Sequence, residues 1–408
     1  MLFKIHKNLF TEIVSRIAPA FVKTTNPQDI GQYLVLKLDK KKNLLTAIVN
    51  RQEVTVKIEI DGDGDLLTIE EDGVFVINGE PLYELLSRST VIDQIVINFD
   101  AKKDVIKAQD PSQTAISLLG SMEVLFPGGE SWSFPVLDLA SIPVPTNPTI
   151  ELKGDDHFKV NAQEFSKFIL QVGMAVGKDN LDARFRNVLI RTTGNRYEII
   201  ATTGIHLAWV RALCKEMSGE FSMTIPHEQT MLVTNVSSPE LDLTIVHHKG
   251  TPGSCVCHQE FLYGERSLGK IMIKTTCSPE PFAKFDKMIK NLDFISSLKL
   301  KTQQFKPICS RMDIFTDPRT TVAVDTKKGT LVFSKVEDGK VRAKGITIPF
   351  SAVSGEPINL LVSSRHLLLA VSNAEADEIE WKFSGQKSLT CMILSDNLMT
   401  YFAPFTEE

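Results

Sequence analysis

The feature that most constrains the fold of this 408-residue chain is an order of helix-forming and strand-forming segments that recurs three times. Two proline-rich stretches, Ser141 to Ile150 and Cys277 to Phe285, separate the three occurrences. Proline and small polar residues are typical of linkers and turns, and each resulting segment has the size of one domain. Repetition with so long a period predicts three copies of one unit, at residues 1–148, 149–285 and 286–408.

Each copy is predicted to open with an amphipathic helix. Leu9, Phe10, Ile13, Val14 and Ile17 share one face of the first helix, which Pro19 ends. In the second copy, Asn161 and Glu164 form an Asn version of a capping box. In the third copy, we expect the stripe at Ile295, Leu298 and Phe305, with Pro307 closing the helix.

Strands and a second helix follow in each copy. The apolar residues Val54, Val56, Ile58 and Ile60 alternate with period two, as in a half-buried strand, and Asp338-Gly339 predicts a hairpin. Second helices are expected from Glu80, Pro226 and Ser363. The predicted fold class is α+β, with two helices covering one face of a mainly antiparallel sheet in each copy.

Composition narrows the functional class. The formal charge is −5, from 45 basic and 50 acidic residues, which argues against a surface covered with nucleic-acid contacts but permits a basic stripe. Charges interrupt the apolar residues at the start, and no apolar run reaches membrane-spanning length. The six cysteines are expected to be reduced thiols of a cytoplasmic protein.

Candidate metal and catalytic motifs are weak. Asp61 to Gly73 begins like a calcium loop but has Leu66 where the sharp turn requires glycine, so a solvated turn is favoured. Cys255 and Cys257, near His247-His248, lack the two-residue spacing and the second pair of a zinc site, so core cysteines are favoured. No catalytic or nucleotide-binding motif is present. We therefore expect a protein that is not an enzyme, with no cofactor and no metal.

Basic residues recur on the predicted helices and in the loop from Gly177 to Asn187. A solvated helix face is the ordinary interpretation of any one of them, but recurrence in three copies favours a shared, inward-facing basic surface. The candidates are Lys7, Arg16, Lys167, Lys299, Lys301 and Arg365 on the helices, and Lys178, Arg184 and Arg186 in the loop.

The segment ATTGIHLA, from Ala201 to Ala208, raises the question of what His206 does. This segment resembles the A-T-D-G-H-R-L-A segment of the bacterial DNA sliding clamp, the beta subunit of DNA polymerase III. Pro281 to Ile289 resembles the clamp segment that ends the middle domain, and Met399 to Phe405 resembles the clamp's C-terminus. The opening helix is similar too, so the resemblance extends over nearly the whole chain.

The resemblance implies a head-to-tail homodimer, a ring of six similar domains that encircles duplex DNA without reading its sequence. It implies an apolar pocket that binds peptides of the replicative DNA polymerase and the clamp loader. The pocket residues implied by the match are Thr202, Gly204, Ile205, His206, Leu207, Ala283, Met288, Ala403, Pro404 and Phe405. His206 is expected at the rim as a hydrogen-bonding group.

The resemblance also implies further DNA and subunit contacts. Lys23 lies near a basic position that clamps use in their first domain, and Thr114 to Gly120 resembles the edge strand at the subunit joint, with Ile116 and Leu118 in the interface. The alternatives are a repeated β-rich structural or virion protein, or a hydrolase that uses scattered acidic residues. The first would need neither inward-facing basic residues nor an apolar C-terminal tail.

Overall fold

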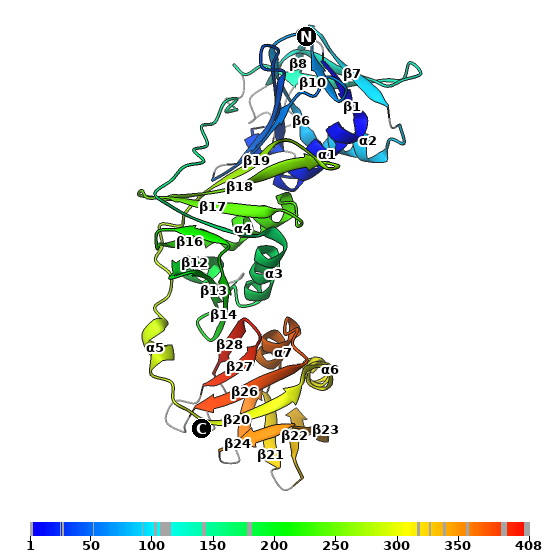
Figure 1. Cartoon of the computed structure of the whole chain (residues 1–408). Helices are drawn as coiled ribbons and strands as arrows, with labels where there is room; N and C mark the ends of the chain where they lie inside the picture. The colour runs from blue at the N-terminus through cyan, green and yellow to red at the C-terminus, as the bar shows by residue number, and fades with distance from the viewer. Residues whose placement is uncertain are drawn as a thin grey trace. The chain divides into compact units, whose positions relative to one another are not determined.

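The computed structural model describes residues 3–24, 26, 28–51, 53–91, 93–101, 104–106, 116–140, 144–177, 182–315, 319–325, 328–337, 340–355, 359–384 and 390–403. The chain forms two compact units (Figure 1). Unit 1 comprises Met1–Ser166, Lys215–Gly219 and Glu228–Cys277, and unit 2 comprises Lys167–Cys214, Glu220–His227 and Ser278–Glu408. No helix in the described residues is long and apolar enough to cross a membrane.

The predicted threefold repetition is confirmed in the order of elements. Each repeat runs strand, helix, three strands, two further strands, helix, and three strands, with one additional short strand, β8, in repeat 1. Repeat 1 contains β1 (Phe3–His6), α1 (Lys7–Ile17), β2 (Tyr33–Asp39), β3 (Leu44–Asn50), β4 (Val54–Asp61), β5 (Leu67–Ile69), β6 (Gly73–Asn78), α2 (Gly79–Arg88), β7 (Gln94–Asp100), β8 (Asp104–Ile106), β9 (Ile116–Leu125) and β10 (Ser131–Leu137).

Repeat 2 contains β11 (Asp156–Asn161), α3 (Ala162–Gly173), β12 (Asn187–Thr193), β13 (Arg196–Thr202), β14 (His206–Leu213), β15 (Glu216–Ser218), β16 (Ser222–Pro226), α4 (His227–Val236), β17 (Asp242–His248), β18 (Ser254–Tyr263) and β19 (Arg266–Thr276). The short helix α5 (Asp286–Lys290) follows. Repeat 3 contains β20 (Phe294–Lys301), α6 (Thr302–Met312), β21 (Arg319–Asp325), β22 (Thr330–Glu337), β23 (Lys340–Pro349), β24 (Ala352–Ser354), β25 (Asn359–Ser363), α7 (Ser364–Ser372), β26 (Glu378–Ser384), β27 (Cys391–Ser395) and β28 (Leu398–Phe402).

Strand pairing repeats as well, and it is antiparallel throughout. The opening strand of each repeat pairs with the strand after the second helix, as in β1–β7, β11–β17 and β20–β26. Two further pairs join neighbouring repeats: β4 with β19 inside unit 1, and β14 with β28 inside unit 2. We call these joint 1 and joint 2. Because one continuous sheet crosses each joint, the structure has no break at residues 148 and 285. The domain boundaries at these positions remain predictions from the sequence.

Local sequence explains the helices. The carboxamide of Asn161 accepts from the Glu164 amide at 3.0 Å, as the capping pattern predicts, and Ser363 caps α7 in the same way. Helices α6 and α7 cover one face of the strands of repeat 3 (Figure 1). Phe305 of α6 and Leu367 of α7 pack there in one apolar core with Trp381 of β26.

Two sequence predictions about elements were wrong. Ile295 and Leu298 lie on strand β20 rather than on a helix, because burial there alternates with period two and β20 pairs with β26. Pro307 lies inside α6 instead of closing it. Lys299 and Lys301 are therefore exposed residues of a strand.

The third incorrect prediction concerns the edge strand. β9 is an interior strand, paired with β10 on one side and with β7 and β8 on the other. Leu118 packs against the core of its own repeat, next to Tyr33 and Val35. The edge strands of this sheet are β10 and β5, so Ile116 and Leu118 do not lie on an edge strand.

Candidate functional site

The site centres on the turn between β13 and β14, where Thr203, Gly204 and Ile205 connect the strands. The Thr202 hydroxyl donates to the carbonyl of His206 at 2.9 Å, and the Gly204 amide donates to that hydroxyl at 3.0 Å. Gly204 has φ +93°, a conformation that glycine adopts without steric cost. A side chain there would also meet the Phe185 ring at 3.1 Å. The turn leaves Ile205 62% exposed.

An apolar cluster covers the face of the sheet opposite the helices at joint 2. Leu207 pairs with Tyr401 across the joint, and Trp209 pairs with Met399. Phe282 and other apolar side chains of the connecting segment 278–293 pack against these strands. The cluster comprises Leu189, Ile200, Leu207, Trp209, Phe285, Met392 and Tyr401, with Phe282, Ile289, Leu292, Phe294 and Met399 at its margin.

A charged network holds the connecting segment onto the sheet. Arg191 bonds to Glu198 and donates to Asp286 of α5 at 3.0 Å. Arg211 donates to the other oxygen of Glu198 at 2.7 Å. Both guanidinium groups also lie against the Trp209 ring, at 5.4 and 4.8 Å from its centroid. Because Glu198 is only 4% exposed, these two arginines compensate a buried carboxylate, and Arg191 then fixes α5 beside the cluster.

His206 is a core residue and not a rim group. It is 2% exposed, and its ring stacks on that of His366 from α7, with centroids 6.1 Å apart. Neither ring nitrogen has a hydrogen-bond partner among the described residues. Burial, with a smaller contribution from His366, lowers the pKa of His206 to about 3. His206 is therefore neutral at physiological pH and has no described partner that would make it a catalytic base.

The structure brings most of the other predicted pocket residues to this region. Thr202 and Leu207 are buried, Gly204 and Ala403 are exposed, and Ala283 is partly buried. Pro404 and Phe405 lie outside the described residues, as does the side chain of Met288. Sequence reasoning missed Trp209, Phe285 and Tyr401. The signal for Trp209 was the alternation that places Leu207 and Trp209 on one face of a strand.

The predicted basic surface is only partly available. Lys7 is 5% exposed and its ammonium donates to the Ser89 carbonyl at 2.7 Å, so it does not face solvent. Burial also lowers its pKa. Four other candidates are already in ion pairs: Arg16 with Glu12, Lys23 with Glu80, Lys167 with Glu375, and Arg184 with Asp182. Arg186 and Arg365 are exposed, and Lys178 lies outside the described residues.

Among the described residues, no group of three or more His, Cys, Asp and Glu side chains could hold a metal ion. Cys255 and Cys257 are buried side by side on β18, with sulfur atoms 3.8 Å apart, as expected for core cysteines.

Comparison with known proteins identifies the architecture. No protein-family model and no curated protein matches the sequence. Among solved structures, the DNA polymerase sliding clamp of Bacillus subtilis matches with a TM-score of 0.80 at 14% identity, over 100% of both chains. The DNA polymerase III beta subunit of Pseudomonas aeruginosa matches with a TM-score of 0.78 at 13% identity, again over 100% of both chains.

A third similar structure is the Helicobacter pylori beta clamp bound to a DNA ligase peptide, with a TM-score of 0.73 at 13% identity over 100% of both chains. All three similarities extend over the whole chain, in the element order described above, at identities far below those at which sequences align reliably. The chain therefore has the fold of the bacterial DNA sliding clamps, the beta subunits of DNA polymerase III, on a strongly divergent sequence.

Proposed function

We propose that this protein is a DNA sliding clamp: a homodimeric ring that encircles duplex DNA and tethers a replicative DNA polymerase. It would act without catalysis, in the cytoplasm at the replication fork, and a clamp loader would place it on DNA. The observation that carries the proposal is the repeated joint. Two joints of the same construction lie within one chain, and the strands that would form a third are left open at its two ends.

The two existing joints share a helix contact as well as a strand pair. Arg16 of α1 donates to the carbonyl of Ser237, the residue after α4, at 3.4 Å. Gln171 occupies the same place in α3 and donates to the carbonyl of Asn373, the residue after α7, at 3.0 Å. The equivalent residue of α6 is Arg311, which is exposed. The equivalent acceptor is the carbonyl of Ser89, after α2 of repeat 1, which also accepts from Lys7.

The open strands are β10 of repeat 1 and β23 of repeat 3, the counterparts of β19 and β4 at joint 1. An unpaired strand edge is a template for another chain. Large apolar side chains are exposed at both ends: Trp132 at 48% on β10, Val341 at 61% on β23, and Ile314 at 76% just after α6. Trp132 lines a cavity of about 510 Å³ between α2 and β10. These features support a joint 3 between two copies.

Ile314→Asp tests this assembly. Wild-type protein should scatter light as a dimer, at twice the chain mass of 45.4 kDa. The substitution places a charge where an isoleucine side chain would be buried, at a loss of roughly 2 kcal/mol or more per interface, so a ring with two such interfaces should dissociate at micromolar concentration. The control is Leu213→Asp, which alters a residue 59% exposed on β14, a strand of a different sheet from either open strand. A wild-type monomer, or equal dissociation of both variants, would refute joint 3.

DNA contact is proposed for Arg186 and Arg365, two exposed candidates of the predicted basic surface that are in no ion pair with a described acid. Contacts of this kind bind phosphate without sequence preference and weaken with salt. Replacing both residues by Ala should reduce the slope of log K against log salt by about 2, roughly one for each contact. Arg184→Ala is the comparison, since Asp182 holds that guanidinium at 2.6 Å and the effect should be smaller. An unchanged slope in the double variant would remove both residues from the DNA surface.

Peptide docking is proposed for the apolar cluster at joint 2. Joint 1 supplies the internal comparison, because it has the same strand pairing with a different surface. Where joint 2 pairs Trp209 with Met399, joint 1 pairs Lys57 with Met272, and Lys57 bonds to Glu59 at 2.7 Å. The apolar surface is thus not a requirement of the joint. An apolar surface with a few polar groups is typical of a peptide site.

Apolar burial supplies much of the binding free energy that such a site needs. Micromolar affinity requires about 8 kcal/mol, and burial of two or three large apolar side chains provides roughly 1.5 to 3 kcal/mol each. The DNA ligase peptide in the Helicobacter pylori clamp is a convenient probe for the site. Leu207→Asp should abolish its binding and the stimulation of the cognate polymerase, while Thr55→Asp, the equivalent change at joint 1, should not.

Deletion of residues 404–408 gives a second test, since the resemblance places Pro404 and Phe405 at the margin of the cluster. Stimulation of the polymerase and loading by the clamp loader should both collapse, because both partners are proposed to use one site. The dimer mass should be retained. Full stimulation by the truncated protein would show that the site lies elsewhere.

A further inference from the structure

A lysine lies in the core of repeat 3, and the proposed function has not yet given it a role. Lys335 of β22 is 1% exposed, the lowest exposed fraction among the buried charged side chains of the described residues. It lies two residues after Phe333, which is fully buried in the same strand. A buried ammonium is costly unless it is bonded, so the contacts of Lys335 indicate what this position requires.

The contacts of Lys335 lead to the C-terminal end of α6. Its ammonium donates to the carbonyl of Met312, the last residue of the helix, at 2.7 Å, and to the hydroxyl of Ser364 in α7 at 3.3 Å. That hydroxyl donates in turn to the Asp313 carboxylate at 3.4 Å, and the centroid of the Phe315 ring lies 5.4 Å from the ammonium. The last carbonyls of a helix have no partner within it, and a cation there is favourable.

Ile314 lies between these anchored neighbours and is 76% exposed, more than any other large apolar side chain of the described residues. Its equivalent in repeat 2 is Met174, at the same distance from the start of the first helix. Met174 takes part in the helix contact of joint 2, where the side-chain nitrogen of Asn373 donates to its sulfur at 2.9 Å. By repeat equivalence, Ile314 is placed to contact the end of α2 in a second copy.

The residues equivalent to Lys335 at the two joints within the chain are apolar. The register of the pairs β2–β3, β12–β13 and β21–β22 places Val49 and Ala201 at this position, and both are fully buried. A lysine is therefore not a requirement of the fold here. It occurs in the repeat whose joint would form between two chains.

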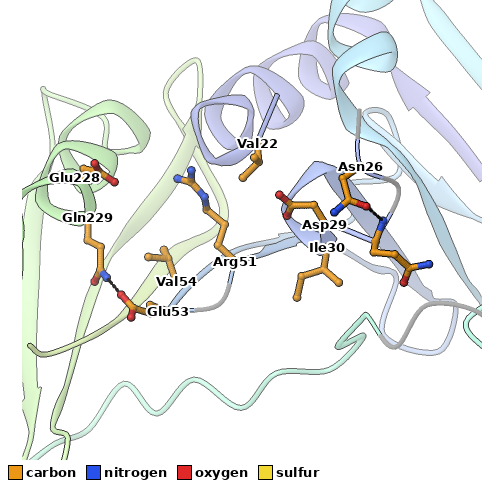
Figure 2. Close-up of a pocket in the computed structure, with 10 residues that line it drawn as sticks. Val22, Asn26, Asp29, Ile30, Arg51, Glu53, Val54, Glu228 and Gln229 are labelled. Atoms are coloured by element: carbon orange, nitrogen blue, oxygen red, sulfur yellow. Dashed lines mark hydrogen bonds between the residues drawn. The ribbon is translucent and has the colours of Figure 1, made fainter. Parts of the chain in front are cut away.

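Joint 1 has open space beside its first helix. Val22, in the loop after α1, and Arg51, directly after β3, line a cavity of about 680 Å³ (Figure 2). Covalent continuity keeps repeats 1 and 2 together, so joint 1 does not depend on a segment that is ordered in advance. Two separate chains lose translational and rotational freedom when they associate, and a segment ordered beforehand lowers the further cost of forming the interface.

We propose that Lys335 is a positioning residue of joint 3. From the core of repeat 3, it fixes the segment from Met312 to Phe315 so that Ile314 is presented to the partner copy. This inference rests on the proposed ring and names the residue that prepares one side of its intermolecular joint.

The first test is Lys335→Met, which keeps an unbranched side chain of similar length and removes the ammonium. Because apolar residues occupy the equivalent positions in repeats 1 and 2, the urea midpoint of the variant should not fall. Its dimer dissociation constant, measured by analytical ultracentrifugation on dilution, should rise at least about tenfold, since the ring contains two such joints. Lys328→Met is the matched control: it removes a lysine 79% exposed from the same hairpin and should leave dimerisation unchanged.

Amide hydrogen exchange of residues 306–315 gives a second measurement that needs no dimer. In the Ile314→Asp background, where joint 3 is blocked, Lys335→Met should speed exchange in this segment by about tenfold or more, because its anchor is lost. Ser364→Ala removes the hydroxyl between Lys335 and Asp313 and should have a smaller effect in both measurements.

Two results would overturn this inference without affecting the proposed ring: equal dimerisation of the wild type and Lys335→Met, or unchanged exchange in the Ile314→Asp background. A fall in the urea midpoint that accounts for the loss of dimer would also overturn it, because Lys335 would then support only the fold of repeat 3. A monomeric wild type would refute joint 3 itself, and Lys335 would then have no partner surface to prepare.

Discussion

Acidification should weaken the folded protein through His206, and the size of the effect follows from its burial. The pKa of about 3 in the folded state lies below the ordinary value of 6.5, so the unfolded chain takes up the proton first. Stability is therefore full above about pH 6.5 and falls as the pH drops toward 3. With these two values, linkage predicts that His206 alone lowers the free energy of unfolding by roughly 2 kcal/mol between pH 7 and pH 5.

Urea unfolding of the wild type and of His206→Phe at pH 5, 6 and 7 measures this effect. Tryptophan fluorescence is a suitable signal, because Trp209 and Trp381 are buried in unit 2, the unit that contains the histidine pair. Phe cannot be protonated, so the variant should lose about 2 kcal/mol less than the wild type on going from pH 7 to pH 5. His157→Asn, which removes a histidine 36% exposed, is the control for removing any histidine. Parallel pH profiles for wild type and His206→Phe would refute the burial argument.

Three further predictions concern stability and accessibility. Gly204→Ala should cost about 1 to 2 kcal/mol in urea unfolding, because φ is +93° and the new methyl group meets Phe185; an unchanged midpoint would show that the turn relaxes freely. Glu198→Gln should destabilise unit 2 by about 2 kcal/mol, since Arg191 then loses its buried carboxylate partner. Protease cleavage within residues 278–293 should increase, because Arg191 also bonds to Asp286 in that segment. Unaltered cleavage would show that this network does not hold the segment on the sheet. Native protein should react with a thiol reagent only slowly and only at Cys214, the one half-buried cysteine, whose pKa burial raises to about 11; fast reaction of several thiols would contradict the packing.

The threefold repetition and most helices and strands could be predicted from the sequence because their patterns are local. The alternation from Val54 to Ile60 and the cap at Asn161 involve residues close in sequence, and the structure confirms both. β20 was mistaken for a helix because Ile295 and Leu298 are three residues apart, as on a helix face. Only the pairing of Leu298 with Trp381 on β26 determines that this segment is extended.

The remaining errors concern contacts between residues distant in sequence. The edge was expected at Thr114 to Gly120, but the edge strand is β10, Ser131–Leu137; its Pro135 is tolerated there because the outer N–H groups of an edge strand need no partner in the sheet. His206 was placed at a rim because nothing near it in sequence indicates His366. The cluster at joint 2 was found through resemblance, and its Trp209–Met399 pair could be recognised only once β14 and β28 were known to be neighbours.

The central claim is that two copies close around DNA through β10 and β23. The most direct measurement introduces cysteines at Ser133 and Arg342, one on each open strand, and joins them with a bismaleimide in the presence of nicked circular plasmid. A closed ring should stay on the circle in high salt and detergent, where phosphate contacts are screened, and should be released when the plasmid is cut once. Equal retention on circular and linear DNA would contradict encirclement.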